Sequence, residues 1–190
     1  GKARGVLRDA LLDRGLVSSS AKRVFASVRA MVNFVICEYG LKATNPFLHV
    51  FFPELNDTKK RMPFSTMEIR LLHDKCRSTD DDVRHLAALI SDTGVRLAEA
   101  TGLKVSDIKI GGPIPYIHIR PNPIRRLKTK QSERQVPLIG ASLWAAKRIL
   151  ATSSGDYAFP RYVKNGTCLA NSASATLNKW IRSNIGNDLV

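Results

Sequence analysis

The sequence has few of the features that mark disulfide-rich or zinc-binding proteins. Its 190 residues include only three cysteines and four histidines. The cysteines lie far apart without CxxC spacing, so they indicate neither a disulfide framework nor a zinc site. The histidines are equally scattered, and no two have the helical spacing of metal ligands. These residues are Cys37, Cys76 and Cys168, and His49, His73, His85 and His118.

Long apolar runs are also absent. None approaches the roughly 18 residues of a membrane-spanning helix, and no signal-peptide pattern opens the chain, so we expect a cytoplasmic protein without a membrane partner. Acidic residues are scarce: 16 Asp and Glu stand against 30 Lys and Arg, which gives a formal net charge of +14. This excess favours an anionic polymer as partner, with nucleic acid as the first candidate.

The one acidic run does not predict a metal site. Asp80, Asp81 and Asp82 are consecutive, so they cannot all face one ion from a helix, whereas their charge suits a helix N-terminus. Metal-dependent nuclease chemistry is therefore not favoured. We expect no metal, no other cofactor and no small-molecule substrate.

Helical periodicity dominates the first part of the chain. A short helix is predicted over Val6–Asp13, and a longer amphipathic helix over Ser18–Gly40, with Ser18, Ser19 and Ser20 as candidate N-caps. The opposite face of the longer helix carries Lys22, Arg23 and Arg29. The apolar stripe of this helix comprises Val24, Val28, Met31, Val32, Val35 and Tyr39.

The pattern changes between Asn45 and Pro63, where prolines, a turn-like Asn-Asp pair and a basic cluster occur. We place a linker at residues 53–63, after a small helical domain at 1–52 and before a second domain at 64–190. In the second domain a capping box is predicted at Ser65 and Glu68, ahead of an inward stripe of Ile69, Leu72 and Cys76. A further helix follows the three aspartates, with Val83, Leu86, Ala87 and Ile90 facing the core.

The rest of the second domain predicts a small sheet between helices. Strands are expected at Ile108–Ile110, Tyr116–Arg120 and Arg134–Leu138, the last two joined by a long basic hairpin tip. Helices follow at Ala141–Thr152 and Ser172–Ile185, the latter capped by Asn171. The predicted fold class is mostly α with a small antiparallel β-sheet, that is, α+β.

Arg96 is the first candidate for chemistry. It follows Gly94 by two residues at a predicted helix start, and Glu99 lies one turn further on. A guanidinium held by a neighbouring carboxylate offers a planar fork of donors that matches two phosphate oxygens. The plainer alternative is a surface helix pair worth a few tenths of a kcal/mol.

The surrounding segment, T-G-V-R-L-A-E-A-T-G-L-K-V-S-D-I, resembles the first arginine box of the tyrosine recombinases, the phage-integrase family. The box pattern is TGxRxxEhxxLxxxDI, in which h is apolar. The resemblance implies that Arg96 is catalytic and that Glu99 and Asp107 support it. It also implies a helical core-binding piece followed by part of a catalytic domain.

The hairpin R-R-L-K-T-K-Q-S-E-R-Q-V-P-L resembles the family's β-hairpin, whose lysine reaches the scissile phosphate. The resemblance implies that Lys128, with Lys130 as the alternative, protonates the leaving 5′ oxygen. Otherwise both are solvated hairpin charges. Lys104 to Arg134 carries eight basic residues against two acidic ones, which favours a phosphate-binding face that includes Arg125 and Arg126.

The helix at Ser18–Gly40 is similar to the later helices of the family's core-binding domain. The resemblance implies that double-stranded DNA is the partner and that Lys22, Arg23 and Arg29 contact its phosphates; alternatively, these cations only solubilise the helix. It leaves self-association on DNA open, and it implies association with the nucleoid when DNA is bound.

The family cleaves and rejoins DNA at specific sites through a 3′-phosphotyrosine. The HxxR box and the nucleophilic tyrosine are expected after the last predicted helix and are not found, so we expect a chain truncated at both ends. Tyr39, Tyr116, Tyr157 and Tyr162 are interpreted as core or surface aromatics. Whether this chain is itself an enzyme stays open. The alternatives are a non-catalytic DNA-binding fragment, a degenerate integrase, or a basic protein that binds an acidic protein.

Overall fold

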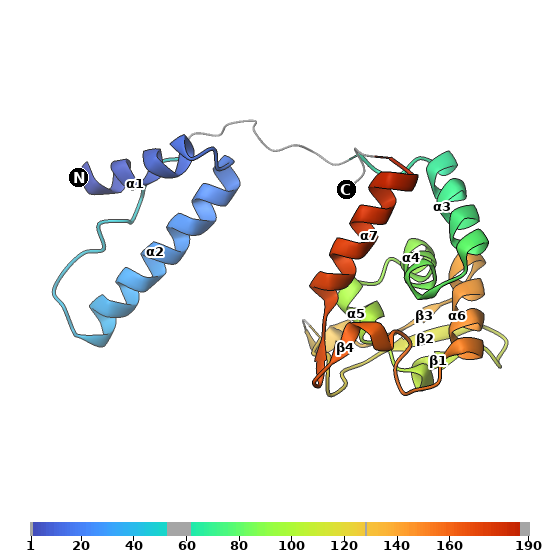
Figure 1. Cartoon of the computed structure of the whole chain (residues 1–190). Coiled ribbons are helices and arrows are strands. Elements are labelled where there is room, and N and C mark those ends of the chain that lie inside the picture. Colours follow the sequence, from blue (N-terminus) through green and yellow to red (C-terminus); the bar gives the residue numbers. More distant parts are fainter. Residues whose placement is uncertain (1, 53–61, 128, 187–190) are drawn as a thin grey trace. The chain divides into compact units, whose positions relative to one another are not determined.

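The computed structural model describes residues 2–52, 62–127 and 129–186, which belong to two compact units (Figure 1). One unit is Gly1–Lys60 and the other is Arg61–Val190. Within the described residues most of the regular structure is helical, and the strands form one three-stranded antiparallel sheet and one hairpin. The predicted fold class, mostly α with a small antiparallel sheet, is confirmed.

The first unit consists of two helices, α1 (Lys2–Asp13) and α2 (Ser18–Glu38), and the segment that follows them. Both helices were predicted. Phe25 of α2 is 3% exposed because Phe47 and Phe52 of the following segment pack edge-on against its ring, with centroids 5.5 and 5.2 Å away. Aromatic contacts of this kind contribute beyond the area they bury. They form a small core for a unit with few other buried side chains.

The predicted apolar stripe of α2 is not the face that is buried in this unit. Ser18, Ala21 and Phe25 are its buried residues, whereas most of the predicted stripe, including Met31 and Tyr39, is exposed. Periodicity identified an amphipathic helix, but burial depends on which face the following segment covers. The serine cap is also wrong, because Val17 occupies the N-cap position and makes no side-chain cap bond.

The second unit is built around α4, which α3, α5, α6 and α7 contact (Figure 1). Residues His85 to Leu89 of α4 are buried without interruption, as expected of a helix covered on several sides. The bounds of the helices are α3 (Thr66–Thr79), α4 (Asp82–Thr93), α5 (Leu97–Thr101), α6 (Gly140–Thr152) and α7 (Ala170–Asn184). Short 3₁₀ turns occupy η1 (Val105–Asp107), η2 (Lys130–Ser132) and η3 (Pro160–Tyr162).

The sheet has the order β1 (Ile108–Lys109), β2 (Tyr116–Ile119) and β3 (Arg134–Pro137), all antiparallel. The three predicted strands are confirmed, each one residue shorter at its end than expected. Ile117 and Ile119 point into the core, and the register pairs Ile119 with Arg134. This pairing fixes Arg134 at the start of β3.

A second hairpin, β4 (Val163–Lys164) with β5 (Thr167–Cys168), was not predicted. Its turn residues Asn165 and Gly166 both have positive φ, 49° and 68°. Asn-Gly is the preferred pair for such a two-residue turn, so the signal was present in the sequence.

In the second unit, two of the predicted helix caps are confirmed and one is wrong. The capping box is confirmed: Ser65 N donates to Glu68 Oε2 at 2.7 Å, and Glu68 N donates to Ser65 Oγ at 3.3 Å. Asp81 caps α4 as its charge predicted. Asn171 does not cap α7, because the helix already begins at Ala170 and Leu169 holds the N-cap position.

The three consecutive aspartates bind separate partners. Asp80 ends α3 with a φ of 50°, Asp81 precedes α4, and Asp82 is the first residue of α4. Their partners are His85 and Arg148 for Asp80, the Arg84 amide and guanidinium for Asp81, and Arg161 for Asp82. Each carboxylate therefore forms its own ion pair within the second unit.

The cysteines are free thiols, and burial raises the pKa of Cys76 to about 12. In the described ranges, His, Cys, Asp and Glu side chains form no group of three that could hold a metal ion. None of the described helices has the length and apolar character needed to cross a membrane.

Gly140 provides a test of the contact between α4 and α6. Its φ is +47°, and an added Cβ would lie 3.0 Å from Asp92 Oδ2, which accepts a hydrogen bond from Ser142 N at 3.0 Å. We expect Gly140→Ala to lower the free energy of unfolding by about 1–2 kcal/mol, because it combines backbone strain with a shifted carboxylate. Urea unfolding measures the change. Gly155→Ala is the control, since Gly155 faces open space, and equal effects of the two substitutions would contradict this role for Gly140.

Candidate functional site

Arg96 stands at the junction between two helices. Gly94 ends α4 with a φ of +61°, Val95 is buried, and Arg96 occupies the N-cap position of α5. The Arg96 amide donates to Glu99 Oε2 at 2.9 Å, which satisfies one of the free N–H groups of the helix start. The turn at Gly94, anchored by the buried Val95, therefore fixes where the Arg96 side chain begins.

Glu99 binds two arginines that are distant in sequence. Arg96 Nη1 lies 2.8 Å from Glu99 Oε1, and Arg134 Nη2 and Nη1 lie 2.9 and 3.3 Å from Glu99 Oε2 and Oε1. The Glu99 side chain is only 5% exposed, whereas those of Arg96 and Arg134 are 57% and 35% exposed. The carboxylate thus lies beneath two guanidinium groups that reach solvent.

The ionisation of Glu99 follows from these contacts. Burial by itself raises the pKa of a carboxyl group, but hydrogen bonds from Arg134, the Arg96 amide and the Arg96 guanidinium outweigh it and lower the pKa of Glu99 to about 2. Glu99 is therefore charged at neutral pH. A charged, nearly buried carboxylate restricts the orientations of both guanidinium groups.

The two arginines border an open polar depression of about 520 Å³, lined also by Gly94, Thr129, Gln131 and Ser132. The Thr129 and Ser132 hydroxyls are 3.0 Å apart, and the Ser132 carbonyl accepts from Arg134 Nη1 at 2.8 Å. The β2–β3 connection thereby meets the start of α5. Two cations with hydroxyl and amide groups, and no carboxylate on the lining, form a surface suited to an oxyanion such as a phosphate.

Only some of the site residues predicted from the sequence lie at or next to this depression. Arg96 borders it, and Glu99 holds Arg96. Lys128, the predicted general acid, lies outside the described residues. Lys130 begins η2, which also contains the lining residues Gln131 and Ser132.

Arg125 corrects the predicted DNA-facing set. Its side chain is buried, with the residue 3% exposed, and its guanidinium donates to the backbone carbonyls of Glu99 and Arg120. Burial lowers the pKa of Arg125, and the charges of Asp107 and Glu99 act in the opposite direction. Arg125 therefore joins α5 to the end of β2 inside the unit, and it is not exposed to contact DNA. Arg126, its neighbour, is exposed.

Asp107 is 1% exposed and binds Arg120, whose Nε and Nη2 lie 2.7 and 2.6 Å from Asp107 Oδ1. This pair connects η1 to the residue that follows β2. The two residues lie next to β1 and β2, strands of the sheet that positions Arg134. A supporting role for Asp107 stays a prediction.

Sequence reasoning counted Arg134 only among the basic residues of the hairpin and did not single out Thr129, Gln131 or Ser132. Glu99 and Arg134 are 35 positions apart. No local spacing signals such a pair, because the antiparallel pairing of β2 with β3 creates it. The strand boundary at Arg134 was the one available indication.

None of the described residues that line the depression is a tyrosine. Tyr162 is buried, and burial raises its pKa, which disfavours the phenolate form. Tyr157 stacks under Lys104 Nζ at 5.9 Å from the ring centre, and Tyr116 borders a different surface depression. Tyr39 lies in the first unit.

The remaining predicted cations lie in the first unit. Lys22, Arg23 and Arg29 all project from α2 and are exposed. In the described part of the chain these three side chains form no ion pair.

Glu99 predicts a characteristic dependence of stability on pH. Because its folded-state pKa of about 2 is below the usual 4.5, its stabilising contribution is present above pH 4.5 and is lost as pH falls towards 2. We expect Glu99→Gln to lower the free energy of unfolding at pH 7 by on the order of 1–3 kcal/mol. The difference from the unmodified protein should shrink between pH 4.5 and 2, as measured by urea unfolding across that range. Glu133→Gln, at an exposed carboxylate, is the control; a difference independent of pH would contradict the assignment.

The buried hydrogen bonds of Arg125 lead to a second prediction. Arg125→Met keeps much of the side chain's length but leaves the Glu99 and Arg120 carbonyls without their donor, so we expect a loss of about 2–4 kcal/mol in the free energy of unfolding. Arg126→Met at the exposed neighbour should change stability by less than about 0.5 kcal/mol. Thermal or urea unfolding of both variants provides the comparison. Similar stability of the two variants would show that Arg125 is not an internal connection.

No protein-family model matches this chain, and no curated protein does. Among solved structures, the chain is similar to one described as "Crystal structure of XerA recombinase", with 18% sequence identity and a TM-score of 0.47. The match covers 97% of this chain and 59% of that chain, so this chain spans less than two thirds of the recombinase's length.

Proposed function

We propose that the second unit binds a backbone phosphate of double-stranded DNA at the depression formed by Arg96, Arg134 and the β2–β3 connection. The observation that carries the proposal is the pair of solvent-reaching guanidinium groups held by the buried carboxylate of Glu99. Because each guanidinium presents a planar fork of donors, two of them can bind several oxygens of one phosphate.

The chemistry supported by this arrangement and by the arginine-box resemblance is DNA strand cleavage and rejoining of the tyrosine-recombinase type. A tyrosine oxygen attacks the phosphorus, the bond to the 5′ oxygen breaks, and a 3′-phosphotyrosine conserves the bond energy for rejoining without a cofactor. Arg96 and Arg134 neutralise the charge that develops on the phosphate oxygens. Lys128, or Lys130 in its place, gives its proton to the leaving 5′ oxygen. In the intact protein this reaction supports site-specific recombination or integration.

The remaining cations provide binding that does not read sequence. Lys22, Arg23 and Arg29 in the first unit, with Arg126 and Lys130 in the second, would contact further phosphates. In this proposal residues 1–52 act as a core-binding domain, 53–63 as a linker and 64–190 as part of a catalytic domain. The net charge of +14 concentrates the protein on DNA in the cytoplasm.

A second candidate function is DNA occupancy without cleavage. It is favoured by one observation: no tyrosine lines the depression within the described structure. A duplex nicked near the cleavage site separates the two functions, because the short fragment released by cleavage diffuses away and traps the covalent intermediate. A protein–DNA adduct on a denaturing gel supports cleavage. Salt-sensitive binding with no adduct supports occupancy.

Arg96 provides the quantitative test of phosphate binding. We expect Arg96→Gln to weaken duplex binding about tenfold at moderate salt and to reduce the slope of log affinity against log salt by about 1, because one phosphate contact is lost. Arg96→Lys should recover the charge but not the forked geometry, and so should restore only part of the affinity. Fluorescence anisotropy over a series of salt concentrations measures both quantities.

The matched control is Arg161→Gln. Arg161 is also an exposed arginine paired with one carboxylate, Asp82, but it does not line the depression. Arg161→Gln should therefore change affinity much less than Arg96→Gln does. If the two variants lose the same affinity and the same salt slope, only net charge matters, and the proposed site is wrong.

A further inference from the structure

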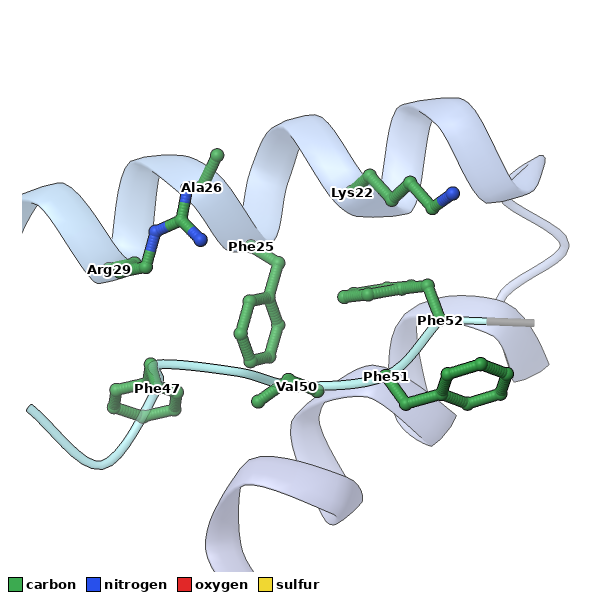
Figure 2. Close-up of a pocket in the computed structure, with 8 residues that line it drawn as sticks. All are labelled: Lys22, Phe25, Ala26, Arg29, Phe47, Val50, Phe51 and Phe52. Atoms are coloured by element: carbon green, nitrogen blue, oxygen red, sulfur yellow. The ribbon is translucent and has the colours of Figure 1, made fainter. Parts of the chain in front are cut away.

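The first unit contains a recess whose aromatic side chains have no role in the proposed function. It has a volume of about 420 Å³ and is lined by Lys22, Phe25, Ala26, Arg29, Phe47, Val50, Phe51 and Phe52 (Figure 2). One wall is α2 and the other is the segment that follows it. Among the described residues that line the recess, none is acidic.

The wall from α2 combines charge at its ends with an apolar centre. Lys22 and Arg29 are seven residues apart, so they lie on one face of the helix about 10.5 Å from each other along its axis. Phe25 and Ala26 lie between them in the helix and also line the recess (Figure 2). This spacing places an apolar surface between two anion-binding groups.

The aromatic wall is held in place before any ligand binds. Phe47 and Phe52 pack on the two sides of Phe25 with interplanar angles of 71° and 80°. The Asn45 side chain accepts from the Phe47 amide at 2.9 Å and donates to the Arg29 carbonyl at 2.9 Å. Arg8 Nη1 donates to the Phe51 carbonyl at 3.1 Å. These bonds fix the backbone on both sides of the recess.

Parts of these rings nevertheless remain exposed in the described structure. Phe51 is 73% exposed, and Phe47 and Phe52 are half-buried. A phosphate alone would use only the cations of this recess. A ligand that uses all of it needs a flat apolar group with an anion on either side, and an unpaired nucleotide flanked by its two phosphates has this composition.

We propose that this recess binds an unstacked nucleotide of single-stranded DNA, with the base against the phenylalanine rings and the flanking phosphates at Lys22 and Arg29. A base within a duplex is stacked and paired, so it cannot enter. Stacking on phenylalanine tolerates every base, and the recess therefore confers a preference for unpaired strands and no sequence preference. This inference goes beyond the phosphate site at Arg96, and it concerns a different unit.

The test compares probes that share their phosphates and differ in their bases. A fluorescein-labelled thymidylate oligonucleotide of about 12 nucleotides, within the range that small single-strand-binding folds cover, is titrated with the full chain. An abasic strand of the same length carries the same charge without bases. We expect the thymidylate strand to bind about tenfold more tightly than the abasic strand.

Three variants identify the recess. Ala26→Leu enlarges a side chain that lines the recess without changing charge, and should remove most of the preference for the thymidylate strand. Lys22→Gln with Arg29→Gln should weaken binding of both strands. Lys42→Gln removes a positive charge from the exposed segment after α2 but does not line the recess, so it should leave the preference unchanged. Circular dichroism checks that each variant is folded.

Equal affinity for the two strands, or a preference that survives Ala26→Leu, would overturn the proposal and leave only charge attraction. Binding of an acidic amphipathic peptide or of anionic vesicles in place of the thymidylate strand would also overturn it. Failure of the proposed Arg96 site would give a different result. Arg96→Gln would then leave duplex affinity unchanged, and Ala26→Leu would still reduce the preference for the thymidylate strand.

Discussion

The carboxylate of Glu99 and the two guanidinium groups above it form the interaction on which the candidate site depends. A charged carboxylate with 5% exposure would destabilise the unit if it were unpaired, so Arg96 and Arg134 contribute to stability as well as to the proposed phosphate site. Glu99 in turn restricts the positions of both arginines. Stability and the proposed phosphate recognition therefore depend on the same three side chains.

The rest of the second unit brings these three residues together. Burial of α4 fixes the turn at Gly94 and Val95, from which Arg96 starts. Pairing of β2 with β3 places Arg134 beside α5, although it follows Glu99 by 35 positions. Arg125, bound to the carbonyls of Glu99 and Arg120, connects the same two elements from inside. The exposed site thus depends on an internal framework that has its own buried charges.

The features that could be predicted from the sequence are those determined by residues close together in the chain. Helices, the sheet strands and the Ser65–Glu68 capping box follow local periodicity and spacing, and so does the Arg96–Glu99 pair, three residues apart. The Asn165–Gly166 hairpin was equally local, and the prediction overlooked it. The buried role of Arg125, the Glu99–Arg134 pair and the buried face of α2 depend on which segments pack together. Composition and periodicity do not contain that information.

The most direct test of the central claim is the affinity of Glu99→Gln for duplex DNA, measured by anisotropy at pH 7 under conditions in which the variant is folded. The substitution removes a negative charge close to the proposed phosphate, so attraction by charge alone would make binding tighter. If Glu99 positions Arg96 and Arg134, binding instead becomes about five- to tenfold weaker, because the forked donors lose their orientation. Unchanged or tighter binding would contradict the account.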